Sequence, residues 1–559
     1  MKKLILICLM GYLCLPISTL KAQSKVVESP PGTDLVYQPG IPGQEGASSS
    51  ARMGALIYGE LINPDSLGPL KLVFSSFSKE LGQTLPDSSM EISTTHGTFF
   101  DGVLDPRVRK FRVRLPQTTE ISYFSLYLND RPLIEDFLIS AQDSIKVGID
   151  LQRSMMVFGG AQGDWMESQY LIGRARKQQH FDSSRDLIEK DKENYLDKED
   201  YRAQLKKASQ EFGASLQILE LGKDHLDRDL ASLLTKEEDI PGMRILNSRK
   251  KMLTPAQYMQ LRENLLGSYY ARALSSIRRY GYLVGKAQNN GQAVEKIERT
   301  MPDILLKLKR QIEEVSEFNL STGRIYFYKE WANMAAVLRE EEFPDLVLNE
   351  FAGKTKNLLL YTYAMEQVSR QQDPVQFLSG IIDKMDPSSY QTKLEEMEIR
   401  LSPQQPLRYA QFSNLDGKQM NTEDLKGKAT LLYFYFSTCT HSANFFRKVL
   451  LPIYQEEING LEIVAVSVDN DPILWKEQLS TYSNPALTNL RLPSQIWRSW
   501  LDHYLITGYP RTMLIDPEGK VLSIWVPGRT AESFRTSLQD LLQPLGSKTS
   551  ILKPSPFQP

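Results

Sequence analysis

The sequence predicts a multidomain α+β protein: an N-terminal antiparallel β-sandwich, a central helical bundle and a C-terminal α/β domain. Three observations support this fold class. At 559 residues, the chain is too long for a single compact core. Short apolar runs separated by turn residues fill its first part, and a charge-rich segment with helical spacing fills its middle. In the last part, apolar runs typical of buried strands alternate with helical patterns.

Composition and charge narrow the possible partners. Hydrophobic residues make up 41% of the chain and charged residues 24%, both ordinary for a soluble globular protein. The formal net charge is −2, and no dense basic stripe interrupts the sequence. Because nucleic-acid binding relies on clustered positive charge, we expect protein or small-molecule partners and no nucleic acid.

The first 23 residues have the pattern of a secretory signal peptide. A basic start, Met1-Lys2-Lys3, is followed by an apolar run from Leu4 to Leu15 and then by small and polar residues as far as Gln23. The apolar run is short for a bilayer span, although an N-terminal membrane anchor is the alternative reading. Residues 24–51, rich in Pro, Gly, Ser and Gln, are expected to form a flexible leader. We therefore expect a periplasmic protein whose mature chain has no stable membrane span.

The number and positions of the cysteines limit the possible thiol chemistry. Of the three in the chain, Cys8 and Cys14 fall in the predicted signal peptide, so the mature protein keeps only Cys439. A single cysteine excludes an internal disulfide. It leaves two interpretations open, a reactive thiol or a buried and inert one.

Residues 52–162 are predicted to form the β-sandwich domain. Turn residues separate its short runs, and several runs alternate apolar with polar residues. The segment offers no set of metal ligands, and His96 beside Gly97 is interpreted as a turn residue. The predicted strands are Ala55–Ile62, Leu70–Phe74, Gly97–Phe100, Lys110–Leu115, Ile121–Leu128, Ile145–Ile149 and Met155–Phe158.

Residues 163–401 are predicted to form a bundle of seven to nine helices. Apolar residues at helical spacing include those of Leu216–Leu221. Thr254-Pro255 and Asp373-Pro374 are typical of capped helix starts. His180 and His225 have no second histidine or cysteine at i+4, so no metal site is expected. Ser402–Pro406 has the composition of a linker.

Residues 408–545 are predicted to form the C-terminal domain, and 546–559 a polar tail. Strand and helix patterns alternate there in the order of a β-α-β unit followed by a β-hairpin and a helix, which predicts a central sheet covered on both faces. The expected elements are a hairpin at Phe412–Lys418, strands at Ala429–Phe436, Leu461–Val468, Thr507–Asp516 and Val521–Val526, and helices at Cys439–Ile458, Asp471–Ser480 and Ala531–Leu542.

Cys439 stands where the most apolar of these strands meets a helix. The run Leu431–Phe436 ends just before it, and the residues after it have the spacing of an amphipathic helix. A thiol at a helix start lies near the positive end of the helix dipole, which favours the thiolate. His441, two residues on, either adds to this effect or is simply exposed.

Three motifs in this domain resemble the TlpA/ResA-like branch of exported thiol–disulfide proteins, which has the thioredoxin fold. They are the segments Phe434–Ser442, Gly508–Thr512 and Leu514–Val521, in the family's order and at suitable separation. The resemblance covers about a quarter of the chain. The preceding β-rich part is similar, more loosely, to a module found before such domains in Bacteroidetes envelope proteins. The resemblance implies a cis-proline at Pro510 which, with Tyr509, holds the client beside Cys439.

The departures from the family pattern limit the chemistry. The family's second cysteine is replaced by Ser442, giving a CxxS motif, and a buried acid that some thioredoxins carry is matched by Tyr433. Because the second thiol resolves the mixed disulfide, a two-thiol cycle within the chain is excluded. Monothiol exchange through Cys439 with envelope proteins or small thiols stays open, with Ser442 and His441 assisting the thiolate. The alternative is a redox-inactive protein-binding module of the cell envelope. Neither requires a cofactor or metal.

Overall fold

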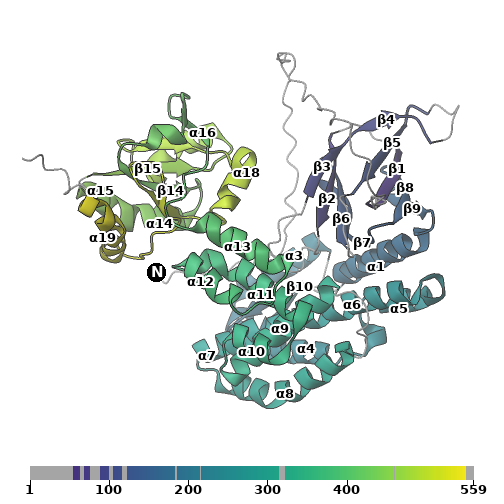
Figure 1. Ribbon diagram of the computed structural model, residues 1–559. Coiled ribbons are helices and arrows are strands. Elements are labelled where there is room, and N and C mark those ends of the chain that lie inside the picture. The colour runs from purple at the N-terminus through teal and green to yellow at the C-terminus, as the bar shows by residue number, and fades with distance from the viewer. Residues whose placement is uncertain are drawn as a thin grey trace, which may run out of the picture. The chain divides into compact units, whose positions relative to one another are not determined.

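The computed structural model describes residues 54–62, 68–75, 88–99, 105–115, 122–182, 185–213, 216–313, 321–456, 458 and 460–548 (Figure 1). All of them belong to one compact unit, Arg52–Pro559. The predicted signal peptide and leader, Cys8, Cys14 and residues 549–559 of the predicted tail lie outside the described residues. Among the helices that are described, none combines the length and the apolar character needed to cross a membrane.

The N-terminal part contains two sheets. One has the strand order β4-β5-β1-β8-β9 and the other β3-β2-β6-β7. Their apolar side chains contribute to one buried cluster. The strands are β1 (Leu56–Ile62), β2 (Leu70–Ser75), β3 (Ser88–Ile92), β4 (Thr94–His96), β5 (Val108–Arg114), β6 (Ser122–Leu128), β7 (Arg131–Ile139), β8 (Ser144–Asp150) and β9 (Met155–Gly159). The sandwich arrangement itself stays a prediction.

The described strands differ from the predicted set in several details, and β3 and β4 were not among the predicted strands. β1 and β8 pair in parallel, so an entirely antiparallel arrangement is wrong; the long connection between them permits parallel pairing. The strand predicted at Gly97–Phe100 is wrong for its described residues, because β4 ends before Gly97, whose φ is +98°. Strand β7 went unrecognised, since charged residues on its exposed side interrupt the apolar pattern.

The central part is mainly helical, with thirteen α-helices in its described residues where seven to nine were predicted. Short helices broken by 3-10 and π turns account for the excess. The α-helices are α1 (Gly163–Asp182), α2 (Lys192–Leu196), α3 (Glu199–Phe212), α4 (Asp224–Leu233), α5 (Met243–Ser248), α6 (Pro255–Ser276), α7 (Val284–Ala287), α8 (Gly291–Glu313), α9 (Thr322–Arg339), α10 (Phe343–Glu350), α11 (Gly353–Gln367), α12 (Pro374–Ile382) and α13 (Ser389–Leu401).

One helical assignment in this part was wrong. Leu216–Glu220 is strand β11, which pairs in parallel with β10 (Arg185–Glu189). A five-residue apolar run fits either a strand or a helix, so spacing alone could not separate them. Both predicted helix starts are confirmed. Thr254 and Gln257 form a reciprocal capping box at α6, and the Asp373 carboxylate accepts a hydrogen bond from the Gln376 N–H at α12.

The C-terminal part has a seven-stranded sheet in the order β13-β12-β16-β15-β14-β17-β18. The central strand β14 is parallel to β15 and antiparallel to β17. Its side chains are buried on both faces, which explains its unbroken apolar sequence. The strands are β12 (Gln411–Asn414), β13 (Gln419–Asn421), β14 (Ala429–Tyr435), β15 (Leu461–Ser467), β16 (Thr488–Arg491), β17 (Arg511–Ile515) and β18 (Val521–Ser523).

Helices accompany this sheet (Figure 1). They are α14 (Thr440–Phe445), α15 (Leu451–Gln455), α16 (Pro472–Glu477), α17 (Leu479–Tyr482), α18 (Ser494–His503) and α19 (Ala531–Lys548). Helix α19 continues to Lys548, three residues into the segment predicted as tail. The segment predicted as a linker hydrogen-bonds along β18, where the Gln404 N–H donates to the Val521 carbonyl at 2.8 Å.

Candidate functional site

The candidate site lies where β14 ends and a helix begins. After Tyr435 the chain makes a short turn, and Cys439 is the N-cap residue of α14. The helix continues through a π turn, η7 (Phe446–Leu450), into α15. Its buried face includes Phe446, Val449 and Ile453, so packing against the sheet fixes the helix that carries the thiol.

Cys439 is nearly covered. Its exposed fraction is 9%, and its Sγ donates to the backbone oxygen of Tyr509 at 3.7 Å. The Tyr509–Pro510 peptide bond is cis. The Tyr509 ring meets Phe436 edge to face, with 5.6 Å between centroids, and burial raises the pKa of the Tyr509 phenol to about 12. The fold therefore brings Cys439, Tyr509 and Pro510 together.

Ser442 is fully buried, and its hydroxyl has no hydrogen-bond partner among the described residues. Its backbone carbonyl accepts a hydrogen bond from the Tyr433 hydroxyl at 3.0 Å. Burial holds the Tyr433 pKa well above its usual range. Tyr433 is therefore a neutral hydrogen-bond donor beneath the helix start, and it cannot replace a carboxylate as a proton acceptor at neutral pH.

His441 lies on the outer side of the same turn of helix and is exposed. Within the part of the chain that the structure describes, its ring forms no hydrogen bond or ion pair. The structure thus places His441 near Cys439 in sequence without joining the two side chains. Its assisting role stays a prediction.

Two residues that the sequence reasoning missed hold the turn before Cys439. The Asp469 carboxylate, 8% exposed, accepts hydrogen bonds from the Ser437 N–H, the Ser437 hydroxyl and the Ser467 hydroxyl. The Tyr482 hydroxyl accepts the Thr438 N–H at 2.8 Å. A signal was available for Asp469, because it directly follows the strand expected beside β14, and parallel neighbours end at the same edge of a sheet.

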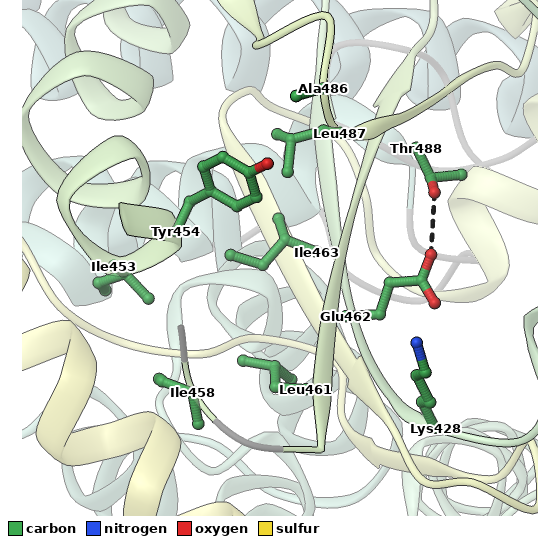
Figure 2. A pocket seen from close by; sticks show the side chains of 10 residues that line it. All are labelled: Lys428, Ile453, Tyr454, Ile458, Leu461, Glu462, Ile463, Ala486, Leu487 and Thr488. Atoms are coloured by element: carbon green, nitrogen blue, oxygen red, sulfur yellow. Dashed lines mark hydrogen bonds between the residues drawn. The ribbon is translucent and has the colours of Figure 1, made fainter. Parts of the chain in front are cut away.

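The described part of the chain also has a cavity of about 270 Å³ away from the thiol (Figure 2). It is at the opposite end of the strands, since Lys428 precedes β14, Leu461 begins β15 and Thr488 begins β16. Glu462 accepts a hydrogen bond from the Thr488 hydroxyl at 2.8 Å across its rim. This cavity is therefore separate from the chemistry at Cys439.

The donor groups of the site limit what it can do. Cys439 is the only free cysteine in the residues that the structure covers, and they contain no cluster of three His, Cys, Asp or Glu side chains suited to a metal ion. A thiol next to a cis peptide and a backbone carbonyl can attack a disulfide held beside it. The Ser442 hydroxyl in the following turn cannot form a disulfide with it.

Comparison with known proteins places this part of the chain among thioredoxin-like proteins. A family model described as Thioredoxin-like matches residues 427–521. The chain is 31% identical over 133 residues to the thiol–disulfide oxidoreductase ResA of Bacillus subtilis, covering 24% of this chain and 72% of that protein. The ResA of Bacillus cereus is 29% identical over 133 residues, covering 23% and 72%.

Among solved structures, the thioredoxin domain of a thiol–disulfide oxidoreductase from Bacteroides vulgatus is 22% identical. That match covers 26% of this chain and 99% of the other, with a TM-score of 0.23.

Proposed function

The chain belongs to the ResA-like family of thioredoxin-like thiol–disulfide oxidoreductases, and from this premise we propose that it exchanges disulfides through Cys439 alone. The observation that carries the proposal is the position of the thiol, 3.7 Å from the Tyr509 carbonyl and beside the cis peptide before Pro510. A disulfide bound along this segment would lie next to the sulfur of Cys439.

The proposed reaction has two steps. The Cys439 thiolate attacks a client disulfide, so that a new Cys439–client disulfide forms and the other client sulfur leaves as a thiolate, which takes a proton from water. An external thiolate then attacks the mixed disulfide and releases Cys439. Ser442 has no sulfur for an internal second step. Its buried hydroxyl is free to donate a hydrogen bond to the thiolate between the two steps.

Tyr509 and Pro510 are proposed to hold the client, and His441 to favour the thiolate. The partners are proposed to be proteins or small thiols of the cell envelope, reached by export through the predicted signal peptide, residues 1–23. The mature protein would then act in the periplasm. No nucleic acid, metal or cofactor takes part in the proposed reaction.

A second function is favoured by a specific observation. Cys439 is nine-tenths buried and the resolving position holds Ser442, so the domain is also suited to binding a protein without redox chemistry. In that case Cys439→Ala would leave partner binding unchanged, whereas monothiol exchange requires the sulfur.

The proposal is tested by trapping the mixed disulfide. We expect wild-type protein incubated with a peptide disulfide to form a covalent adduct at Cys439 that dithiothreitol removes. Cys439→Ser, the matched control, should form none. Failure of the folded wild-type protein to form the adduct at a large excess of disulfide would contradict monothiol exchange. Protein binding without redox chemistry would then be the remaining function.

Restoring the second thiol should change the activity qualitatively. Ser442→Cys places a sulfur in a buried site whose present hydroxyl makes no hydrogen bond with any described residue, so the substitution removes no observed hydrogen bond. We expect this variant to catalyse insulin reduction at least about tenfold faster than wild type, because a second thiolate resolves the mixed disulfide internally. Ser442→Ala is the control and should not exceed the wild-type rate, because it adds no second sulfur. Equal rates for all three proteins would show that Cys439 is not competent for attack.

A further inference from the structure

We propose that Asp469 is a positioning residue for Cys439, acting through the turn Ser437-Thr438. The inference rests on the proposed function, since it concerns the thiol that would react. It goes beyond that function by assigning a role to a carboxylate on a different strand.

The carboxylate joins the ends of two neighbouring strands. Its two oxygens accept the Ser437 N–H at 3.1 and 3.0 Å, and Oδ2 also accepts the Ser437 hydroxyl at 2.8 Å. The Ser467 hydroxyl, on β15, donates to the same Oδ2 at 2.6 Å. All these groups are buried, where an unpaired donor is costly, so the hydrogen bonds fix Ser437 relative to β15.

The turn needs such support because of Thr438. Its φ is +89°, a left-handed conformation that is strained for a β-branched residue. Such a conformation persists where its surroundings impose it. Here Asp469 holds the preceding residue and the Tyr482 hydroxyl accepts the Thr438 N–H, so the backbone that leads into the strained conformation is anchored at two points.

The position of the thiol follows from this turn. The Cys439 N–H donates to the Phe436 carbonyl at 3.3 Å and closes the turn that Asp469 holds. The sulfur then lies against the Tyr509 carbonyl with little exposure. Releasing Ser437 would therefore free the thiol from its covered position.

The test compares alkylation of Cys439 by iodoacetamide across pH in the full chain, followed on the Cys439 peptide by mass spectrometry. The variants are Asp469→Ala, which removes every acceptor, and Asp469→Asn, which keeps an oxygen for the Ser437 N–H. Asp516→Ala is the matched control. Asp516 is in the same domain and is also buried, and it accepts the Lys520 N–H at 2.8 Å in the β17–β18 turn.

We expect the rate at high pH, where the thiol is fully ionised, to rise at least about threefold in Asp469→Ala because the thiol becomes accessible. Asp469→Asn and Asp516→Ala should stay near wild type. An unchanged high-pH rate in Asp469→Ala would overturn the proposal. An equal shift of the rate–pH profile along the pH axis in Asp469→Ala and Asp469→Asn would also overturn it. Both variants remove the negative charge, so an equal shift would mean that the charge alone affects the thiol.

If Asp469→Ala fails to fold, Ser437→Ala decides, because it deletes the Ser437 hydroxyl that donates to Asp469 and leaves the carboxylate in place. A raised high-pH rate supports the proposal, and an unchanged rate overturns it. Alkylation reports on the thiol whether or not it exchanges with disulfides. A wild-type protein that forms no mixed disulfide, with a threefold rise in Asp469→Ala, would therefore refute the proposed function and leave the positioning role intact.

Discussion

Two buried carboxylates, in different parts of the molecule, are held in opposite ways. Asp469, beside the thiol, accepts hydrogen bonds from two residues through both of its oxygens. Glu263, on α6, is 1% exposed, and neither of its oxygens accepts a hydrogen bond from any described residue. The Arg324 guanidinium on α9 is 3.6 Å away. Burial outweighs this charge and raises the pKa of Glu263 to about 7.

The two carboxylates differ because different interactions fix the structure around each of them. Hydrogen bonds of definite direction hold the turn before Cys439, as a site needs when a reacting atom must be placed accurately. At α6 and α9, two glycines let the backbones approach closely, because a Cβ on Gly267 would lie 2.2 Å from the Gly323 oxygen. Glu263 is one helical turn before Gly267 and is covered by that close contact. Close packing of the two helices determines the structure here, and the raised pKa of the Glu263 carboxyl is a consequence of its burial.

The largest effect is expected from breaking the packed region. Gly267→Ala would push a methyl group into the Gly323 backbone, which no side-chain rearrangement can relieve. We expect a loss of about 3 kcal/mol or more in the unfolding free energy of the helical part, measured by chemical denaturation.

The matched control for this substitution is Gly380→Ala in α12. A Cβ there would meet no described atom within 4 Å, so the change should stabilise by about 0.5–1 kcal/mol through helix propensity. Similar small effects for the two substitutions would show that the α6–α9 contact is not tight. Close packing would then no longer distinguish this helix pair from the hydrogen-bonded turn before Cys439.

The second prediction concerns pH. Because the folded-state pKa of Glu263 is raised from 4.5 to about 7, the folded protein holds a proton there that the unfolded chain has lost. The stabilisation is fully present below about pH 4.5 and is lost as pH rises through about 7. We expect wild-type stability to fall by about 2–3 kcal/mol between pH 5 and pH 8 from this group.

Glu263→Gln isolates this contribution, since the amide is neutral at every pH. Subtracting its stability curve from that of wild type, both from denaturation at several pH values, should reveal the fall between pH 5 and pH 8. Parallel curves would mean that Glu263 is ionised in the folded protein, as a carboxylate with hydrogen-bond partners would be.

The sequence predicted much of the C-terminal domain because its strands carry strong signals. Leu431–Tyr435 is apolar throughout, since β14 is buried on both faces, and Cys439 follows after a short turn. The mixed α/β character and the thioredoxin-like domain are confirmed. The short strands β10 and β11 were not found, because five residues carry too little periodicity to distinguish strand from helix.

The sequence indicated the strand end at which Asp469 lies, but not which groups Asp469 and Tyr482 would bind. Asp469 is 30 residues from Cys439, and Tyr482 is further still, so neither belongs to a local motif. Their roles depend on the register of β14 against β15, which places Tyr435 opposite Ser467. The positive φ of Thr438 was likewise unpredictable, because a threonine carries no preference for that conformation and tertiary hydrogen bonds impose it.

The smallest expected effect tests the second anchor of the turn. In Tyr482→Phe the ring stays and continues to stack on Tyr435, but the Thr438 N–H loses its acceptor. Because the lost bond joins neutral groups and Thr438 is exposed, water can take over as acceptor, and we expect a loss of about 1 kcal/mol in the unfolding free energy of the C-terminal part. Tyr454→Phe is the control, because its hydroxyl has no hydrogen-bond partner among the described residues and its removal should cost almost nothing. If the two substitutions cost the same, the hydroxyl of Tyr482 does not support Thr438, and Asp469 alone would have to impose the strained turn.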